Sequence, residues 1–273
     1  MRSGVQPDIV QCRRRSPRTD ARRSLHVLFN GTTIKAEDVG LIHETPDGQA
    51  MLDLQFRDRK QAGQLLAKRL RSYADRPDVL VLALPRGGVP VAYEIARALH
   101  VPLDVFLVRK LGVPGQEELA MGAIASGGVR VINDEVVRAL RITLHVIDSV
   151  AAKEVRELAR REQLYRKGRP ATDVHGRTVI LADDGLATGS TVRAAVAALR
   201  LQQPKRIIVA VPIAAEPTNA ELRSQVEELI CLAMPEPFYS VGFWYEDFSQ
   251  TNDEEIRELL ERASKELSPA HQR

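Results

Sequence analysis

The chain has 273 residues, of which 44% are hydrophobic, and a formal net charge of +3. This length is enough for one large α/β domain or two small ones. No run of about eighteen apolar residues occurs, which argues against a membrane span, and the arginine-rich first residues lack the apolar segment of a secretory signal. The two cysteines, Cys12 and Cys231, indicate neither a disulfide framework nor a metal cluster, so we expect a reducing, cytoplasmic compartment.

The positive charge is concentrated at the N-terminus. Residues 1–25 hold seven arginines against two aspartates, a net charge of +5, which leaves −2 for residues 26–273. Because the remaining chain is not basic, we expect no nucleic-acid partner for the folded domain. Residues 1–24 have no hydrophobic periodicity, so a disordered, solvated tail is expected there.

The rest of the chain divides into three parts. We expect an N-terminal extension of unassigned role over residues 25–52, one main domain over residues 53–267 and a short tail over residues 268–273. Within the extension the local patterns predict a strand at 25–29, a turn at 30–31 and a loop over 40–49.

The main domain begins with a helix, a buried strand and a glycine-rich turn. Apolar residues between Phe56 and Tyr73 recur at helical spacing with Arg and Lys opposite, which predicts an amphipathic helix. Residues 79–84 are apolar throughout, so we place them in the middle of a parallel sheet, followed by a turn and a helix over 91–99. The turn contains Pro85, Arg86, Gly87 and Gly88. Its exposed N–H groups and its arginine would bind an anion, although an ordinary strand-to-helix loop explains the same residues.

The next strand, expected over residues 105–108, leads into a segment rich in glycine and proline. Arg109 and Lys110 stand at the end of this strand, and residues 111–122 include Glu117 and Glu118. A long insertion after a buried strand predicts a mobile lid. A solvated strand end and exposed loop acids are the alternative interpretations of these charged residues.

Further elements follow before the centre of the sequence. A turn at Gly127-Gly128 and a strand over 129–132 precede a short helix capped by Asn133. A long charged helix is predicted over 149–165, and we expect Arg160, Arg161 and Arg166 on its solvated face, with contact to a ligand or a partner subunit as the alternative.

The most informative stretch runs from Thr178 to Val192. An apolar strand ends at two carboxylates, Asp183 and Asp184, and continues into a loop of small and hydroxylated residues and a helix that begins near Thr191. The backbone of such a loop can approach a ligand closely, and the free N–H groups at the helix start can bind a phosphate. Two acids beside a phosphate would repel it, so they predict ribose hydroxyls and a hard divalent cation bound next to the phosphate.

Other phosphate-binding loops do not fit this stretch. The nucleotide-triphosphate loop needs a lysine after its last glycine, whereas Gly189 is followed by Ser190. A dinucleotide-binding loop has its carboxylate far downstream, whereas here the acids precede the loop. An ordinary strand-to-helix turn accounts for an acid and a glycine but not for the two acids and the run of small residues together.

The last third of the chain completes an alternating pattern. Strands are predicted over 206–212 and 229–233, with a helix over 218–226 between them. Alternation of this kind predicts an α/β fold with a doubly wound, mainly parallel sheet, whose ligands bind at the carboxyl ends of the strands. Residues 238–248 contain six of the chain's twelve aromatic residues and precede a final helix over 253–267.

The stretch Val179-Ile-Leu-Ala-Asp-Asp-Gly-Leu-Ala-Thr-Gly-Ser-Thr191 resembles the signature of the type I phosphoribosyltransferases, which binds 5-phosphoribosyl 1-pyrophosphate (PRPP). The Pro85 turn is similar to the pyrophosphate loop of that family, which often contains a cis non-proline peptide bond, and residues 109–122 are similar to its flexible catalytic lid. The matching segments lie within residues 55–250. The resemblance implies a phosphoribosyltransferase domain with a flexible lid and a small C-terminal hood.

The resemblance also implies roles for individual residues. Catalytic roles fall to Arg86, Arg109, Lys110, Glu117 and Glu118. PRPP would contact Pro85, Arg86, Gly87, Gly88, Asp183, Asp184, Gly185, Leu186, Ala187, Thr188, Gly189, Ser190 and Thr191. Mg²⁺ would be held indirectly, as Mg-PRPP, by Asp183 and Asp184. Phe243 or Trp244 would stack on the base.

The implied reaction transfers 5-phosphoribosyl from PRPP to a nitrogenous base and releases pyrophosphate. Enzymes of the family that act on 6-oxopurines have an Asp where this chain has Ala187, whereas adenine enzymes have Ala, so a purine acceptor and purine salvage are favoured. Glu117 or Glu118 could then serve as the acid or base. The alternatives are a PRPP-binding regulator without catalysis and a phosphoribosyl-recognising hydrolase. The expected partners are PRPP and the base but no membrane, and a homodimer is left open.

Overall fold

The computed structural model describes residues 26–29, 32–35, 42–44, 50–52 and 55–267. The chain divides into two compact units, Met1–Gly40 and Leu41–Arg273. The tails predicted over residues 1–24 and 268–273 lie outside the described residues, as do the turn predicted at 30–31 and Cys12.

Short antiparallel strand pairs occur in each unit before residue 55. In the first unit, β1 (His26–Phe29) pairs with β2 (Thr32–Lys35), which confirms the strand predicted at 25–29. In the second unit, β3 (Ile42–Glu44) pairs with β4 (Ala50–Leu52). The loop predicted over 40–49 is therefore wrong at residues 42–44, because these residues pair with a strand that the sequence pattern did not reveal. The rest of that predicted loop lies outside the described residues.

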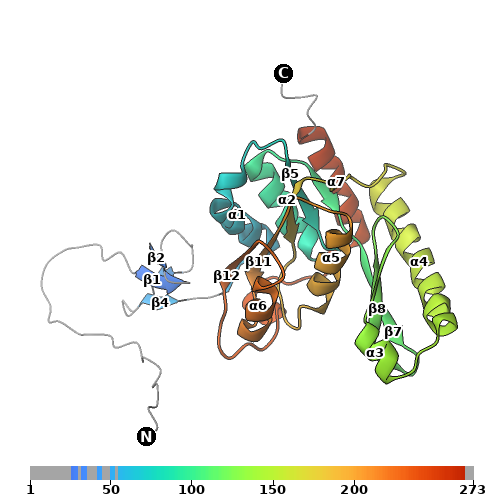
Figure 1. The fold of residues 1–273 in the computed structure, drawn as a ribbon. Coiled ribbons are helices and arrows are strands. Elements are labelled where there is room, and N and C mark those ends of the chain that lie inside the picture. Colours follow the sequence, from blue (N-terminus) through green and yellow to red (C-terminus); the bar gives the residue numbers. More distant parts are fainter. Residues whose placement is uncertain (1–25, 30–31, 36–41, 45–49, 53–54, 268–273) are drawn as a thin grey trace, which may run out of the picture. The chain divides into compact units, whose positions relative to one another are not determined.

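A five-stranded parallel sheet forms the centre of the second unit (Figure 1). Its strands are β5 (Val79–Ala83), β6 (Leu103–Val105), β10 (Thr178–Ala182), β11 (Arg206–Ile213) and β12 (Glu228–Ala233), in the order β12-β11-β10-β5-β6. Every residue of β5 and β10 is buried, as expected for strands covered on both faces. The predicted doubly wound, mainly parallel sheet is confirmed.

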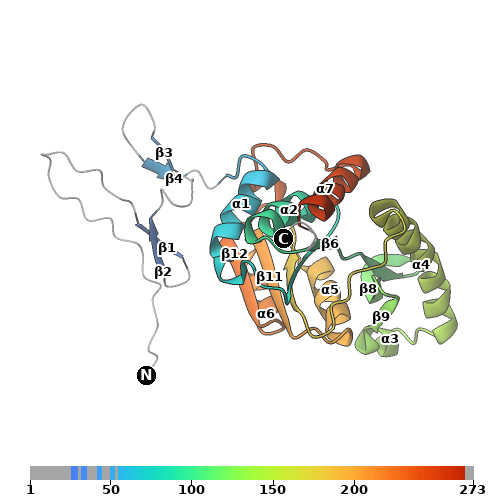
Figure 2. The same cartoon turned by 90° about the horizontal axis from the view of Figure 1, so that it is seen from above.

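Helices cover both faces of this sheet (Figure 2). On one side lie α1 (Arg59–Arg69), α2 (Gly88–Leu99) and α7 (Asp253–Glu266). On the other side α5 (Ser190–Leu201) and α6 (Glu216–Arg223) contribute to a core cluster with side chains of β5, β10 and β11. The helix predicted over 218–226 therefore begins two residues earlier and ends three residues earlier than expected.

The register of the sheet sets the position of the site. Ala83, the last residue of β5, is the partner of Ala182, the last residue of β10. Because parallel strands that end in register deliver their following loops to the same edge, the Pro85 turn and the acid pair lie next to each other.

A second, three-stranded antiparallel sheet contains the segment predicted as a lid. It consists of β7 (Val108–Val113), β8 (Gln116–Ala125) and β9 (Val129–Ile132) in sequence order. Residues 111–122 thus form most of a hairpin, with Gly115 in the turn at φ +79 and with Leu111 and Met121 fully buried. Glycines that indicate a loop in the sequence serve here as turn and bulge residues. The predicted strand at 105–108 is in fact split, because β6 ends at Val105 and β7 begins at Val108.

Two helices follow this sheet. Asn133 caps α3 (Asp134–Ala139) as predicted, and α4 extends over Leu144–Arg166, five residues earlier than expected at its start. Among the described helices none is long and apolar enough to cross a bilayer.

The prediction that Arg166 is solvated is wrong. Arg166 is 5% exposed, and its Nε donates to Asp104 Oδ1 at 3.0 Å while its Nη2 donates to Val105 O at 2.7 Å. A buried guanidinium needs such partners. These contacts attach the end of α4 to strand β6.

Candidate functional site

Asp183 and Asp184 form the centre of the site, directly after β10. The backbone N–H of Asp184 donates to Asp183 Oδ1 at 2.9 Å, so the two residues are held in one compact turn. Gly87 and Gly88 of the neighbouring turn pack directly against them. A Cβ on Gly87 would lie 1.9 Å from Asp184 Oδ2, and a Cβ on Gly88 would lie 2.7 Å from Ala182 O. The two loops therefore meet without room for a side chain.

Arg59, which the sequence did not single out, holds the second acid. Its Nε donates to Asp184 Oδ2 at 2.8 Å, and its Nη1 donates to Ser249 O at 2.7 Å. The guanidinium carbon lies 3.8 Å from the centre of the Phe248 ring. Tyr245 completes this arrangement, since its hydroxyl donates to Asp184 O at 2.7 Å. The start of α1 and residues 245–249 therefore fix Asp184 from two sides.

No local pattern identifies Arg59. In the sequence it is one of several cations on the polar side of an amphipathic helix, and its partner Asp184 is 125 positions away. Only the pairing of the sheet and the packing of α1 bring the two residues together.

Burial dominates the electrostatics of the acid pair. It raises the pKa of Asp183 well above the ordinary value, and the neighbouring Asp184 carboxylate raises it further. Burial also raises the pKa of Asp184, against the opposing effect of the Arg59 guanidinium. The pair therefore ionises less readily than two exposed aspartates.

The loop after the acids ends in an uncapped helix. Gly189 precedes α5 at φ +66, and no side chain caps the first N–H groups of that helix. Thr218 donates from its hydroxyl to Ala187 O at 2.6 Å, and the backbone N–H of Leu186 donates to Ile213 O at 2.8 Å. These contacts fix the loop to α6 and β11 while its own N–H groups at the start of α5 stay available to an anion.

A Cβ on Gly185 would lie 2.5 Å from Val241 Cγ1. Val241, in the segment between β12 and α7, therefore packs directly against the loop at Gly185. The hydroxyls of Thr188 and Ser190 lie 3.3 Å apart at the start of α5.

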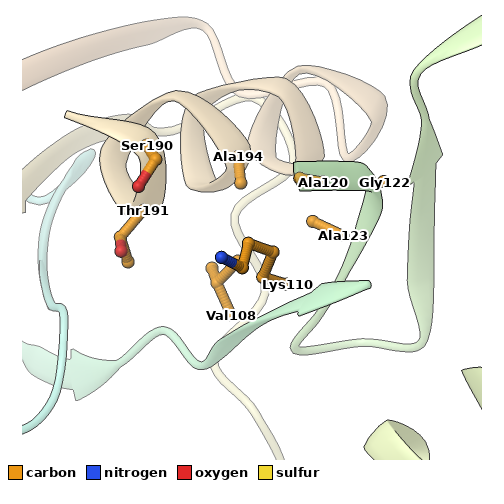
Figure 3. Close-up of a pocket in the computed structure, with 8 residues that line it drawn as sticks. All are labelled: Val108, Lys110, Ala120, Gly122, Ala123, Ser190, Thr191 and Ala194. Atoms are coloured by element: carbon orange, nitrogen blue, oxygen red, sulfur yellow. The ribbon is translucent and has the colours of Figure 1, made fainter. Parts of the chain in front are cut away.

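A pocket of about 210 Å³ lies between the start of α5 and the β7–β8 hairpin (Figure 3). Its lining residues are Val108, Lys110, Ala120, Gly122, Ala123, Ser190, Thr191 and Ala194. Figure 3 shows the Lys110 side chain extending from the facing strand, with its amine directed toward the end of the helix that carries Ser190 and Thr191. One predicted lid residue is thus brought to the predicted phosphate loop.

The other predicted lid residues take different positions. Arg109 is turned toward α4, where its Nη2 lies 2.6 Å from Glu154 Oε2. Glu118 is fully exposed and lies 3.3 Å from Lys110 Nζ. Glu117 accepts the N–H of Gly115 at 3.1 Å at the hairpin turn, and backbone N–H donors lower the pKa of Glu117. Their catalytic roles stay predictions.

The Pro85 turn has the cis peptide bond that its resemblance implies, between Pro85 and Arg86. Gly87 is the N-cap of α2 and provides no side-chain cap. Arg86 is exposed, and within the described residues its side chain has no hydrogen bond or ion pair. The turn thus presents a free guanidinium beside the acid pair's loop.

Of the two predicted base-stacking residues, only Phe243 exposes its ring. Phe243 is 49% exposed and lies 4.9 Å from the Tyr239 ring, between centroids, whereas Trp244 is 9% exposed and packs edge-on against Phe243. Trp244 thus contributes mainly to packing, and stacking on a base stays a prediction for Phe243.

The fold and the positions of these residues define a class of protein. It is an α/β protein in which an acid pair and a glycine-containing turn lie at the carboxyl ends of two adjacent parallel strands. The chain belongs to the phosphoribosyl transferase family, because residues 55–233 match the family model described as "Phosphoribosyl transferase domain".

Individual relatives agree with this assignment. "Putative phosphoribosyl transferase Rv0571c" of Mycobacterium tuberculosis is 45% identical over 215 residues, a match that covers 79% of this chain and 48% of the relative. The chain therefore spans about half the length of that relative. The crystal structure of TT1426 from Thermus thermophilus is 40% identical with a TM-score of 0.69, and the match covers 76% of this chain and 97% of TT1426. "Bifunctional protein PyrR" of Chloroflexus aurantiacus is 39% identical over 131 residues, which cover 47% of this chain and 66% of PyrR.

Proposed function

We propose that this protein transfers a 5-phosphoribosyl group from PRPP to a nitrogenous base, with a purine favoured, and releases pyrophosphate. One observation carries the proposal. The acid pair lies against the Gly87–Gly88 turn with no room for a side chain between the two loops, and the loop that follows the acids leads into the uncapped start of α5. A phosphate, two ribose hydroxyls and a pyrophosphate are the groups that these three features suit.

Each part of the site has a distinct task in this reaction. The N–H groups between Ala187 and Thr191 bind the ribose phosphate, and Asp183 and Asp184 accept hydrogen bonds from the ribose hydroxyls. Arg86 and the Gly87 amide face the departing pyrophosphate and stabilise the charge that develops on it. The β7–β8 hairpin limits the access of water, which would otherwise hydrolyse PRPP.

Mg²⁺ is the proposed cofactor, and the donor chemistry of the site suits it. Asp183 and Asp184 would hold the ion indirectly, through the ribose hydroxyls of Mg-PRPP, and hard oxygens of this kind are the ligands that Mg²⁺ prefers. No group of three or more His, Cys, Asp or Glu side chains within residues 55–267 could hold a metal ion by itself. We therefore propose that substrate oxygens complete the coordination. The ion would supply charge neutralisation at the pyrophosphate.

The favoured purine acceptor depends on two features of the sequence. Ala187 stands where a 6-oxopurine enzyme of the resembled family has an acid, and Glu118 lies on the hairpin next to Lys110. We propose Glu118 as the acid or base, because Glu117 is engaged at the hairpin turn. Phe243 is the proposed stacking partner of the base.

The test of this function is pyrophosphate release from PRPP and Mg²⁺ in the presence of a panel of purine and pyrimidine bases. We expect release that depends on one base or on a small set of purines. Binding of PRPP without release for any base would instead indicate the regulator, and release without any base would indicate a hydrolase.

We expect the affinity for Mg-PRPP to rise with pH, because a carboxyl with a raised pKa is protonated below that pKa and accepts hydrogen bonds best above it. Calorimetric titrations between about pH 5 and about pH 8 measure this dependence. PRPP itself titrates in the same range, so the Asp183→Asn variant is the control. A variant with the same pH dependence as the unaltered protein would show that the phosphates, not Asp183, cause it.

A Gly87→Ala substitution should lower the affinity for PRPP by about tenfold or more, because the new Cβ would lie 1.9 Å from Asp184 Oδ2 and must displace that carboxylate or the turn. Gly128→Ala is the control: Gly128 has φ +73 but no atom within 4 Å of the added Cβ. We expect Gly128→Ala to lower stability by about 1 kcal/mol and to leave PRPP binding unchanged. Equal losses of affinity in both variants would contradict the expected steric effect.

A further inference from the structure

Lys110 and Arg109 point to opposite sides of strand β7. Successive side chains of a strand alternate, and Val108 packs against the core cluster that includes Val192 and Leu199 of α5. Lys110, two residues on, lines the pocket at the start of the same helix. Arg109 pairs with Glu154 of α4 on the other side. The strand thus delivers its lysine, and not its arginine, to the phosphate loop (Figure 3).

The packing of the hairpin on α5 keeps Lys110 in this place. Val129 and Val131 of β9 pack against the same core cluster as Val108. Gln202, at the end of α5, donates from its Nε2 to Ser126 O at 3.1 Å, next to the end of β8. The three-stranded sheet is therefore attached along the length of α5, and Lys110 lies over the beginning of that helix.

The pocket has the size for a small anion, and its few polar side chains are all hydrogen-bond donors. Its volume is about 210 Å³, and its walls include three alanines, Ala120, Ala123 and Ala194. Its polar groups are the Lys110 amine and the hydroxyls of Ser190 and Thr191. All of these can donate hydrogen bonds to a phosphate.

Charge balance explains why a cation is needed at this point. The loop offers only neutral donors, and two carboxylates stand beside it, so a phosphate dianion bound there would meet net repulsion. Arg193, in the first turn of α5, is paired with Glu221 at 3.1 Å, and Arg59 is paired with Asp184. Among the described residues Lys110 Nζ contacts Glu118 alone, with the backbone O at 3.2 Å and the fully exposed carboxylate at 3.3 Å, and an exchange of so weak a surface partner for a phosphate costs little.

We propose that Lys110 binds the 5-phosphate of the phosphoribosyl ligand, and not the pyrophosphate group that leaves. This inference rests on the proposed function, since it assigns one end of the same ligand. It makes Lys110 a binding residue for the phosphate that is retained in the product, and it gives the β7–β8 hairpin a role in holding the ribose rather than in the departure of pyrophosphate.

The test is calorimetric binding of two separate probes, ribose 5-phosphate and pyrophosphate with Mg²⁺, to the full chain. Lys110→Met should raise the Kd for ribose 5-phosphate by about tenfold or more and change the Kd for pyrophosphate by less than about twofold. Lys110→Arg should retain most of the affinity. Glu118→Gln should strengthen ribose 5-phosphate binding, because it removes the competing carboxylate.

Lys153→Met is the matched control, because Lys153 is an exposed lysine of α4 that acts on Glu117 and lines no part of the pocket. It should change neither Kd. A Lys110→Met variant that loses pyrophosphate binding and keeps ribose 5-phosphate binding would overturn this inference but not the proposed function. Unaltered protein that binds neither PRPP nor ribose 5-phosphate would overturn the proposed function together with the inference.

Discussion

Replacement of both acids, Asp183→Asn and Asp184→Asn, should reduce base-dependent pyrophosphate release by at least about a hundredfold. Asn keeps the size of each side chain but removes the charge that favours Mg-PRPP and one acceptor oxygen for a ribose hydroxyl. The loss should appear in kcat/KM and in the Kd for PRPP alike, because the same contacts hold the ground state and the reacting ribose.

The double variant should stay folded. Burial raises the pKa of both acids, so the ionised pair is costly to bury, and neutral amides remove that cost. Asp173→Asn, an exposed acid five residues before β10, is the control and should retain full activity. Full activity of the double variant would show that the acid pair does not hold the ribose, and the phosphoribosyltransferase proposal would then lose its main support.

The sequence predicts the centre of this site well because its chemistry is contiguous. The strand that ends at Ala182, the two acids, the small-residue loop and the helix from Ser190 follow one another without interruption. The second strand-and-turn unit, at residues 79–88, has the same form. Since loops after neighbouring parallel strands gather at one edge of the sheet, their proximity could be expected from the alternating pattern alone.

The β7–β8 hairpin could not be recognised in the same way. A strand covered on one face alternates apolar and polar residues, but β7 is covered by α4 on one face and by α5 on the other. Arg109 therefore has a partner on the α4 side, and Lys110 lines a pocket on the α5 side. In the sequence, the glycines of this segment indicate a loop. Whether a glycine permits a turn or a bulge depends on strand pairing, which one sequence does not reveal.

Arg59 and Arg166 show a related limit. Both are arginines in helices whose sequences suggest a solvated position, and both are largely buried with an aspartate that is distant in the chain. The residue type and the helical period are the same for a buried and an exposed arginine. Only the tertiary contact determines whether such an arginine is buried. For Arg59 that contact is with Asp184 of the acid pair.

The Arg59→Met variant should lose about 3 kcal/mol of unfolding free energy at neutral pH. The side chains of Arg59 and Asp184 are 11% and 16% exposed, so loss of the guanidinium leaves an ionised carboxylate with little water around it. Met retains the aliphatic length that covers Phe248. Arg57→Met is the matched control, because Arg57 is 65% exposed and lies 3.7 Å from Asp58, and it should cost less than about 0.5 kcal/mol.

The pH dependence separates the charge from the packing. Without Arg59 the pKa of Asp184 in the folded protein lies further above its unfolded value, since burial then acts unopposed. A raised carboxyl pKa means that the folded state is favoured below that pKa and loses stability as pH rises through it. The difference in unfolding free energy between the unaltered protein and Arg59→Met should therefore be largest near neutral pH and should decrease as the solution is acidified. Urea denaturation at several pH values measures this difference.

The combination of Arg59→Met with Asp184→Asn decides what the contact contributes. Without the Asp184 carboxylate, loss of the Arg59 guanidinium leaves no unpaired buried charge. The double variant should therefore be more stable than Arg59→Met alone. If the stability losses of the two single variants simply add in the double variant, Arg59 stabilises the protein through Ser249 and Phe248, with which it also interacts. In the first case Arg59 sets the ionisation of Asp184, and its removal should weaken Mg-PRPP binding even where the protein stays folded. In the second case the affinity of the folded protein should be unchanged, because the acid pair would be held without Arg59.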